Sequence, residues 1–584
     1  MAELSIQNPV DASADKSLGW SPAHAQAVVS LARELLRCHF GFESAQSRAD
    51  ELPNIPFTKL NVTVRARGKL RGSMSASGFD IGVVLALAVE RAVNDKRFGG
   101  PLLAGEVEHT ILEIWIQFDC EYLMSPSIEL IREKMELGLH GLEVRCGDKQ
   151  AYFKPSVPLT SHFRSHEEVL SRLCKKAGLA LDSWKVIPMT IGVTHWVHAV
   201  EQMERPASAC ICRGFRVSRA VCREAVRTAC EAAALRLLRS QRADGAYCYK
   251  YHPFTDQEDD SGFNLVRMAG SAYAMCAIAA EKGIRGSAAF ESSAYRAIDF
   301  LMLRAQPTTN GGIFISEIGV PCEGKLGTAA LLARALQYGS FAQRRLEDRK
   351  RLLCGLLEMQ NEAGLLGGVS NKPEDLETGQ DYFPGEALSA LALEQEPSIQ
   401  GKCREALRRA FAPYRQRFRE RPASGFILWQ IEAWAGSWKS LVKEDPQVAS
   451  QYADFVFELA DWILPFQYET QHTPYADYVG GFSRPNPPTF SSAVFTEAII
   501  HAYSLASALG LAVRIERYRA AALAGLNFIL KLQIPSELSG VFPRPELAIG
   551  GFTEGMNSFL IRNDFDQHFI TAALAALRAP SLFE

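Results

Sequence analysis

A repeat in the C-terminal two thirds of the chain limits the possible fold more than any other feature. One unit recurs: an apolar helix, a Gln, a short polar stretch, and then Gly beside an apolar or aromatic residue. Each interval between copies has room for two helices of ordinary length, so the sequence predicts six helical hairpins. The marker residues are Gln241, Gln306, Gln360, Gln416 (in a worn copy), Gln467 and Gln533.

The second helix of each hairpin is rich in small residues, as in "NLVRMAGSAYAMCAIAA" (264–280) and "GEALSALAL" (385–393). Six helices can pack around one axis only where the residues that face each other are small. We therefore predict that residues 206–584 form a closed (α/α)6 toroid with these helices inside. An open solenoid is the alternative, but solenoids keep a tighter period and do not require a polar first turn on every inner helix.

The first part of the chain, residues 1–205, has a different texture. Alternating β-branched and polar residues predict strands at 59–75, 110–123 and 184–197. Helical periodicity is present at 25–40 and 81–98. Strands between unequal helices indicate an α+β domain, so the whole chain is predicted to be a multidomain protein.

Composition excludes several classes of function. The formal net charge is −3, which gives no general attraction to nucleic acid. The chain begins without a basic or apolar leader and has no apolar run long enough to span a membrane. The 13 cysteines are scattered, as expected of reduced thiols. We expect a cytoplasmic protein that acts on a small molecule, without a metal site or cofactor.

Several segments of the first domain resemble the AMMECR domain family. They are "VTVRARGKLRGSMS", "ERAVNDKRFGGPLLAGEVE", "LEIWIQF", "GLHGLEV" and "SRLCKKAGL", and the resemblance covers roughly residues 20–195. It implies an α+β domain with enzymatic or ligand-binding activity. The residues that it makes candidates for a site are Arg71, Ser73 and Asp95.

The chain departs from the family pattern at the suspected reactive position. The pattern is close to L-R-G-C-I-G, and here residues 70–75 read "LRGSMS", so Ser73 replaces the Cys. A second departure follows "AYFKPSV" (151–157), where the family usually has a Leu-Pro motif. A Ser hydroxyl needs an adjacent base to act as a nucleophile. We therefore predict a binding or assembly role for this domain, with a partner protein, and a structural alternative for Arg71 and Asp95 as an ion pair between a strand end and a helix end.

The second half resembles bacterial six-hairpin proteins that carry D-Y-x-P-G-E-A-L and I-R-x-D-x-x-Q-H. These motifs correspond to residues 381–388 and 561–568. In architecture it is also similar to sugar epimerases, glycosidases, uronyl lyases, lanthionine cyclases and terpene cyclases, among which the fold alone cannot choose.

The two motifs place polar side chains at the starts of inner helices that face each other across the ring. Tyr382 and Glu386 are four residues apart and share a helical face, as do Asp564 and His568. Helix N-termini also favour carboxylates and anionic substrates. The catalytic candidates are Glu386, Asp564, Asp566, His568 and Tyr382. The candidates for substrate binding are Asn264, Arg267, Lys325, Asp381, Trp429, Glu432, Tyr478 and Arg562.

Paired carboxylates and a His are what general acid–base catalysis needs. We therefore predict an enzyme that acts on a polar, sugar-like or anionic small molecule in the toroid cavity. A structural interpretation stays open, because Asp and Asn at the start of "NDFDQH" are ordinary helix caps. Two other functions also stay open: a scaffold that binds a ligand or peptide without turnover, and a cyclase of a peptide or other natural product with an aromatic cavity containing Trp429, Trp434 and Trp438.

Overall fold

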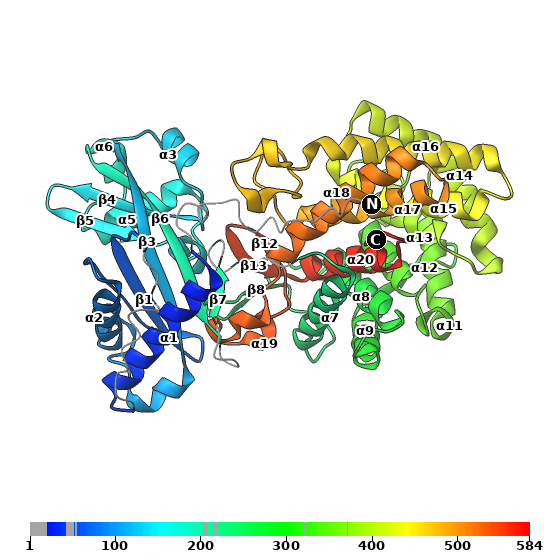
Figure 1. The fold of residues 1–584 in the computed structure, drawn as a ribbon. Helices are drawn as coiled ribbons and strands as arrows, with labels where there is room; N and C mark the ends of the chain where they lie inside the picture. The colour runs from blue at the N-terminus through cyan, green and yellow to red at the C-terminus, as the bar shows by residue number, and fades with distance from the viewer. Residues whose placement is uncertain are drawn as a thin grey trace.

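The structure is a computed structural model that describes residues 20–42, 52, 55–202, 208–211, 213, 216, 220–320, 322–370 and 372–584. The domain boundary expected at residue 205 lies outside these residues. Figure 1 shows a sheet-containing N-terminal part beside a helical C-terminal part, with short strands between them.

The N-terminal part is built on an antiparallel sheet with the strand order β2-β1-β3-β6-β4-β5, with β7 paired to β6. Its strands are β1 (Lys59–Ala66), β2 (Lys69–Ala76), β3 (Thr110–Met124), β4 (His140–Cys146), β5 (Lys149–Phe153), β6 (Thr190–Glu201) and β7 (Ser208–Ile211). Its α-helices are α1 (Pro22–His39), α2 (Ile81–Val93), α3 (Ile128–Lys134), α4 (Ser156–Thr160), α5 (His166–Lys176) and α6 (Ser183–Val186). This is the α+β domain that the sequence predicts.

The two faces of this sheet differ in polarity. Leu60, Val62 and Val64 of β1 pack with α1 and α2 in one apolar core. The alternate residues Asn61 and Thr63 point to the opposite face and are also buried. Side chains from β5 and the residue that follows it reach across that opposite face to β1 and β2, although β5 and β2 lie at opposite ends of the strand order. The sheet therefore curls around a polar interior.

The C-terminal part is an (α/α)6 toroid, as predicted. Within the described residues, six inner helices contact one another in the cyclic order α8, α10, α13, α15, α17, α20 and back to α8. They are α8 (Leu265–Ala279), α10 (Leu326–Ala335), α13 (Phe383–Ala392), α15 (Ile427–Leu441), α17 (Ser491–Ala508) and α20 (Asn563–Arg578). Ala387 and Ala390 of α13 are fully buried, which confirms that this helix lies inside.

A second set of helices surrounds this ring. They are α7 (Arg223–Arg239), α9 (Ser287–Met302), α12 (Leu346–Glu358), α14 (Pro397–Glu420), α16 (Pro446–Ile463) and α18 (Ala512–Leu532). The shorter elements are α11 (Phe341–Arg344), α19 (Pro545–Ala548), β10 (Ala305–Pro307) and β11 (Ile313–Ile315). A small sheet in the order β12-β13-β8-β9 uses β8 (Lys250–His252), β9 (Gln257–Asp259), β12 (Thr553–Gly555) and β13 (Ser558–Arg562).

The repeated Gln has a structural role in four of the six copies. Its Nε2 donates to a Gly carbonyl in its own turn and to a carbonyl of the next outer helix, at distances of 2.8–3.0 Å. Gln533 reaches Ala229 of α7 and so joins the last repeat to the first. Gln306 instead occupies the short strand β10. The prediction for Gln416 is wrong. This residue lies within the long helix α14, where its side chain donates a hydrogen bond to Glu420.

The two parts share a small apolar core and a buried ion-pair network. Ile111 and Val200 of the sheet pack with Phe542 and Phe559 of the toroid. Arg213 lies 2.7 Å from an oxygen of Glu136 in the N-terminal part and 2.6 Å from an oxygen of Asp477 in the toroid.

Candidate functional site

A cavity of about 340 Å³ opens at the N-terminal ends of the inner helices. It collects seven of the residues that the sequence nominates. Residues in the caps or first turns of α8, α13, α15, α17 and α20 line this cavity. The lining residues used below are Asn264, Arg267, Tyr382, Glu386, Trp429, Asp564 and His568.

Glu386 lies in the first turn of α13 and is 5% exposed. Its Oε2 has no hydrogen-bond partner among the residues that the structure describes. Burial therefore raises the pKa of this carboxyl to about 8. Gly327 of α10 leaves the space that the carboxyl occupies, because a Cβ there would lie 2.2 Å from Oε2. Near neutral pH, Glu386 holds a proton that it can donate.

Asp564, in the first turn of α20, is held between two guanidinium groups. Arg562 donates to its two oxygens at 2.5 and 2.9 Å, and the Nε of Arg267 lies 3.1 Å away. The helix N-terminus adds positive potential at the same point. Two cations and one carboxylate leave this part of the cavity with an excess of positive charge.

His568 follows Asp564 by one helical turn and faces the same cavity. Burial lowers its pKa to about 4, with a smaller opposing effect of Asp564. Its Nδ1 is buried and lacks a hydrogen-bond partner in the described part of the chain. The imidazole is therefore neutral at physiological pH and able to accept a proton.

Aromatic side chains form the rest of the mouth. The rings of Trp429 and His568 lie 6.2 Å apart between centroids. Tyr382 is 52% exposed and also lines a neighbouring cavity of about 490 Å³, with which the first shares Gly425 and Val494. The Trp-lined cavity of a cyclase is not seen in this wall: Trp434 instead packs outward against Phe411 and Tyr452.

Asp566 lies outside the cavity, contrary to the prediction from the sequence. Two residues along a helix correspond to about 200° of rotation, so Asp566 faces away from Asp564. It is fully buried between α20 and α7, where it lies 2.9 Å from Arg236 and accepts a hydrogen bond from the Phe552 backbone. Burial raises its pKa to about 6. This position assigns Asp566 to packing rather than to the cavity.

Five predicted substrate-binding residues also lie outside the described lining of this cavity. One is Arg562, which contacts the lining residue Asp564. Lys325 immediately precedes α10, and its Nζ lies 3.6 Å from a carboxylate oxygen of Glu317. Asp381 is exposed to solvent. Glu432 pairs with Arg334 and lines a different cavity together with residues from the later turns of α17 and α20. Tyr478 donates its hydroxyl hydrogen to Glu136 at the boundary between the two parts of the protein.

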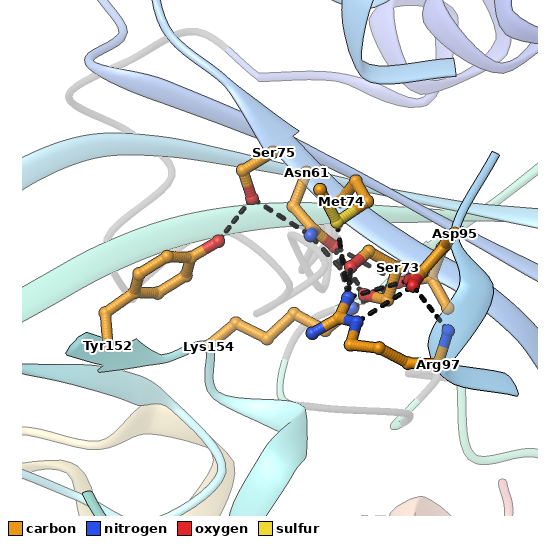
Figure 2. Close-up of polar contacts among 9 residues, drawn as sticks. Asn61, Ser73, Met74, Ser75, Asp95, Arg97, Tyr152 and Lys154 are labelled. Carbon is orange, nitrogen blue, oxygen red and sulfur yellow. Dashed lines mark hydrogen bonds and ion pairs between the residues drawn. The ribbon is translucent and has the colours of Figure 1, made fainter. Parts of the chain in front are cut away.

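The N-terminal candidates lie on and around β2, and Figure 2 shows two of them. The expected ion pair between Arg71 and Asp95 is absent from the described contacts, because each has another partner. Arg71 pairs with Glu106 at 2.7 Å, and Asp95 pairs with Arg97 at 2.7 Å. Asp95 also accepts a hydrogen bond from the Ser73 backbone at 3.0 Å.

Sequence reasoning missed Lys154, which follows β5. Its Nζ lies inside the curled sheet, 2.9 Å from Oδ1 of Asn61 (Figure 2). It also lies 2.5 Å from Oγ1 of Thr63. Nothing local in "AYFKPSV" signals this, since the contact joins residues more than 90 positions apart.

Two general observations concern ligands and membranes. No group of His, Cys, Asp or Glu within the described ranges could hold a metal ion. No helix in the described parts is long and apolar enough to cross a membrane.

Known sequences match the N-terminal part. The AMMECR1 family model matches residues 29–193. A protein of Methanosarcina barkeri is 30% identical over 167 residues, which cover 27% of this chain and 81% of that protein. A protein of Methanosarcina acetivorans is 35% identical over 126 residues, 21% of this chain and 62% of its own length. For a protein of Aquifex aeolicus the match is 36% over 98 residues, 17% of this chain and 49% of its own length.

Solved structures resemble each part at low similarity. An uncharacterized protein of Pyrococcus horikoshii has a TM-score of 0.29 and 22% identity, covering 32% of this chain and 94% of its own. A D-mannose isomerase has a TM-score of 0.39 and 16% identity, covering 61% and 97%. A sugar epimerase from a ruminal bacterium has a TM-score of 0.38 and 13% identity, covering 54% and 87%. By its sequence, the chain belongs to the AMMECR1 family through residues 29–193.

Proposed function

We propose that the toroid is an enzyme that carries out acid–base chemistry on a polar, sugar-like or anionic small molecule. Glu386 carries this proposal: a carboxyl group that is buried, without a partner in the described structure, and directed into an open cavity. Burying such a group without a partner costs free energy. A proton donor matched to neutral pH is a functional reason for accepting that cost.

The proposed chemistry uses the opposite protonation preferences of two groups that line the same cavity. Neutral His568 removes the C–H proton next to a carbonyl of the bound molecule, and protonated Glu386 donates its proton to the carbonyl oxygen, which gives an enediol. His568 then returns its proton to the former carbonyl carbon while Glu386 takes one from the neighbouring hydroxyl, which isomerises a hydroxy-carbonyl compound and restores both groups. Asp564 lies one turn before His568 and favours the imidazolium that forms transiently.

The surroundings of these groups suggest the kind of substrate. The two positive charges of Arg267 and Arg562 outnumber the single negative charge of Asp564. The excess positive charge favours a ligand with a carboxylate or phosphate group. Trp429 and the half-exposed Tyr382 offer aromatic faces to the less polar side of a sugar ring. The adjoining larger cavity gives room for a substrate longer than one sugar unit.

The test is solvent deuterium exchange. The protein is incubated in D2O with aldoses, ketoses, uronic acids and sugar phosphates, and proton NMR follows the loss of C–H signals. Glu386→Gln and His568→Gln should each slow exchange by about 10²–10⁴-fold. Asp381→Asn is the matched control, because this exposed carboxylate precedes the same helix but lies outside the described cavity wall.

Two results would contradict the proposal. One is exchange at the unchanged rate in both cavity variants. The other is a compound that raises the melting temperature of the native protein but is never exchanged or converted, which would support a binding scaffold instead.

A further inference from the structure

The polar interior of the N-terminal sheet contains a continuous chain of hydrogen bonds from the surface to a buried amine. Ser73 of β2 is half-buried, whereas Thr63 of β1 and Lys154 are 2% and 8% exposed. The Ser73 Oγ lies 2.9 Å from the Thr63 Oγ1, which in turn lies 2.5 Å from the Lys154 Nζ. The register of the sheet fixes this arrangement, because Thr63 and Ser73 are direct cross-strand partners.

Lys154 differs from an ordinary buried lysine because no ion pair to it occurs among the described residues. Its nearest polar contacts are the uncharged oxygens of Asn61 and Thr63. The carboxylate of Glu113 is taken up by Arg65 at 2.5 Å. Burial, opposed in part by Glu113, lowers the pKa of Lys154 to about 7. A large fraction of the amine is therefore unprotonated at neutral pH and can accept a proton.

A Ser hydroxyl needs a base to act as a nucleophile. In this domain the amine of Lys154 is connected to Ser73 indirectly, through the hydroxyl of Thr63. We propose that the N-terminal domain holds a second catalytic site, independent of the toroid, in which Ser73 is the nucleophile of an acyl-transfer or hydrolytic reaction, Thr63 relays its proton, and Lys154 receives it.

The reaction balances with water alone. As the Ser73 Oγ bonds to the carbonyl carbon of an ester or amide, its proton moves to Thr63, and the Thr63 proton moves to the Lys154 amine. The tetrahedral intermediate then collapses, and the leaving group departs with the proton returned through Thr63. Water attacks the resulting Ser73 ester with the same relay, which releases the acid and restores the hydroxyl.

Positive side chains outnumber carboxylates around the entrance and favour an anionic acyl group: Arg97, Lys59 and Lys176 lie beside the two carboxylates of Asp95 and Glu143. Arg97 donates to the Ser73 carbonyl at 2.6 Å and lies beside the nucleophile. The Nζ atoms of Lys59 and Lys176 lie 3.9 and 5.2 Å from the Tyr152 ring centroid, and Tyr152 reaches Ser75 on the same face as Ser73. Burial and the charges of Arg97 and Lys59 lower the pKa of Lys176 to about 8.

The experiment uses the full-length protein and two probes. A fluorophosphonate reports covalent modification by intact mass, and p-nitrophenyl succinate against p-nitrophenyl acetate reports turnover and the preference for negative charge. Ser73→Ala should abolish modification. Lys154→Met and Thr63→Val should each slow it by about 10²-fold or more, and Thr63→Ser should restore it to within a few-fold. Ser75→Ala, on the same strand face, is the matched control and should react like the native protein.

The pH profile separates proton transfer from a merely structural role. Modification of the native protein should rise through about pH 7 as Lys154 loses its proton, and Lys154→Met should lose this rise. A thiolate forms without a strong base, so iodoacetamide should modify Ser73→Cys at a similar rate with and without Lys154→Met. Circular dichroism and melting identify any variant that fails to fold. Equal alkylation of Ser73→Cys with and without Lys154→Met then shows that the Lys154 substitution leaves the site intact.

Either of two results overturns the proposal. One is equal modification of native protein and Ser73→Ala. The other is the absence of modification of the folded native protein from pH 6 to pH 9. Neither result bears on the toroid, whose deuterium exchange is measured separately.

Discussion

Replacing Glu386 with Gln should make the protein more stable and less active. The pKa of Glu386 is raised from 4.5 to about 8, so the folded protein keeps this proton over a range in which the unfolded chain loses it. Stability therefore falls as the pH rises from about 4.5 to about 8 and then levels off. At about 1.4 kcal/mol per pH unit, the full difference is about 5 kcal/mol.

Glu386→Gln removes this pH dependence because an amide of similar shape does not ionise. The variant and the native protein should have similar free energies of unfolding near pH 5. At pH 8 the variant should be more stable by several kcal/mol, up to the difference given above. Urea denaturation followed by Trp fluorescence at both pH values measures this, and deuterium exchange on the same samples measures the accompanying loss of activity.

Glu432→Gln is the matched control with the opposite expected sign. Glu432 is also buried in the ring, but it lies 2.5 Å from Arg334 and accepts a hydrogen bond from Ser389. Although burial opposes it, Arg334 keeps the pKa of Glu432 low. Removing its charge leaves the buried guanidinium of Arg334 without its ion-pair partner and should cost about 3–5 kcal/mol. The reasoning about Glu386 is refuted if Glu386→Gln is destabilised at pH 8 or shows the native pH dependence.

Three further predictions concern the toroid. Asp566→Asn should keep the exchange rate per folded molecule, as measured by melting and NMR together, because its side chain pairs with Arg236 outside the cavity. Gly327→Ala should displace the Glu386 carboxyl and slow exchange at least about 10-fold while the ring stays folded; full activity would show that the carboxyl position is not critical. Gln467→Ala should cost about 1–3 kcal/mol in urea denaturation, against less than about 0.5 kcal/mol for Gln416→Ala, and equal costs would remove the role assigned to the repeated Gln.

The toroid could be predicted from the sequence because its determinants are local and repeated. A Gln that bonds its own turn and the next outer helix recurs in four of the six copies, and small residues recur on the helices that face the axis. Gln416 was misassigned because a Gln in a long helix looks the same in sequence as one in a turn. Only the hydrogen-bond geometry of Gln360 and Gln467 separates the two cases.

Helical periodicity was enough to predict which residues of one helix face the candidate cavity. Glu386, Asp564 and His568 lie in first turns and share the cavity, whereas the same periodicity, applied strictly, turns Asp566 to the other side. The contact of Lys154 with β1 was beyond such reasoning. It depends on the curl of a whole sheet, which no local pattern encodes.

Buried charges in this protein follow a rule that the two proposed sites break. Arg236 pairs with Asp566, and Arg334 pairs with Glu432, as expected when removing a charge from water requires compensation. Glu386, Glu497 and Lys154 are buried without an ion pair among the described residues, although Glu497 accepts a hydrogen bond from Thr571. The pKa values of Glu386 and Lys154 are moved toward neutrality. A group that must gain and lose a proton at neutral pH cannot be held in a strong ion pair, because the partner would fix its charge. Glu386 and Lys154 lie in separate polar interiors, one in the ring of helices and one in the curled sheet, so each half of the chain has its own group suited to proton transfer.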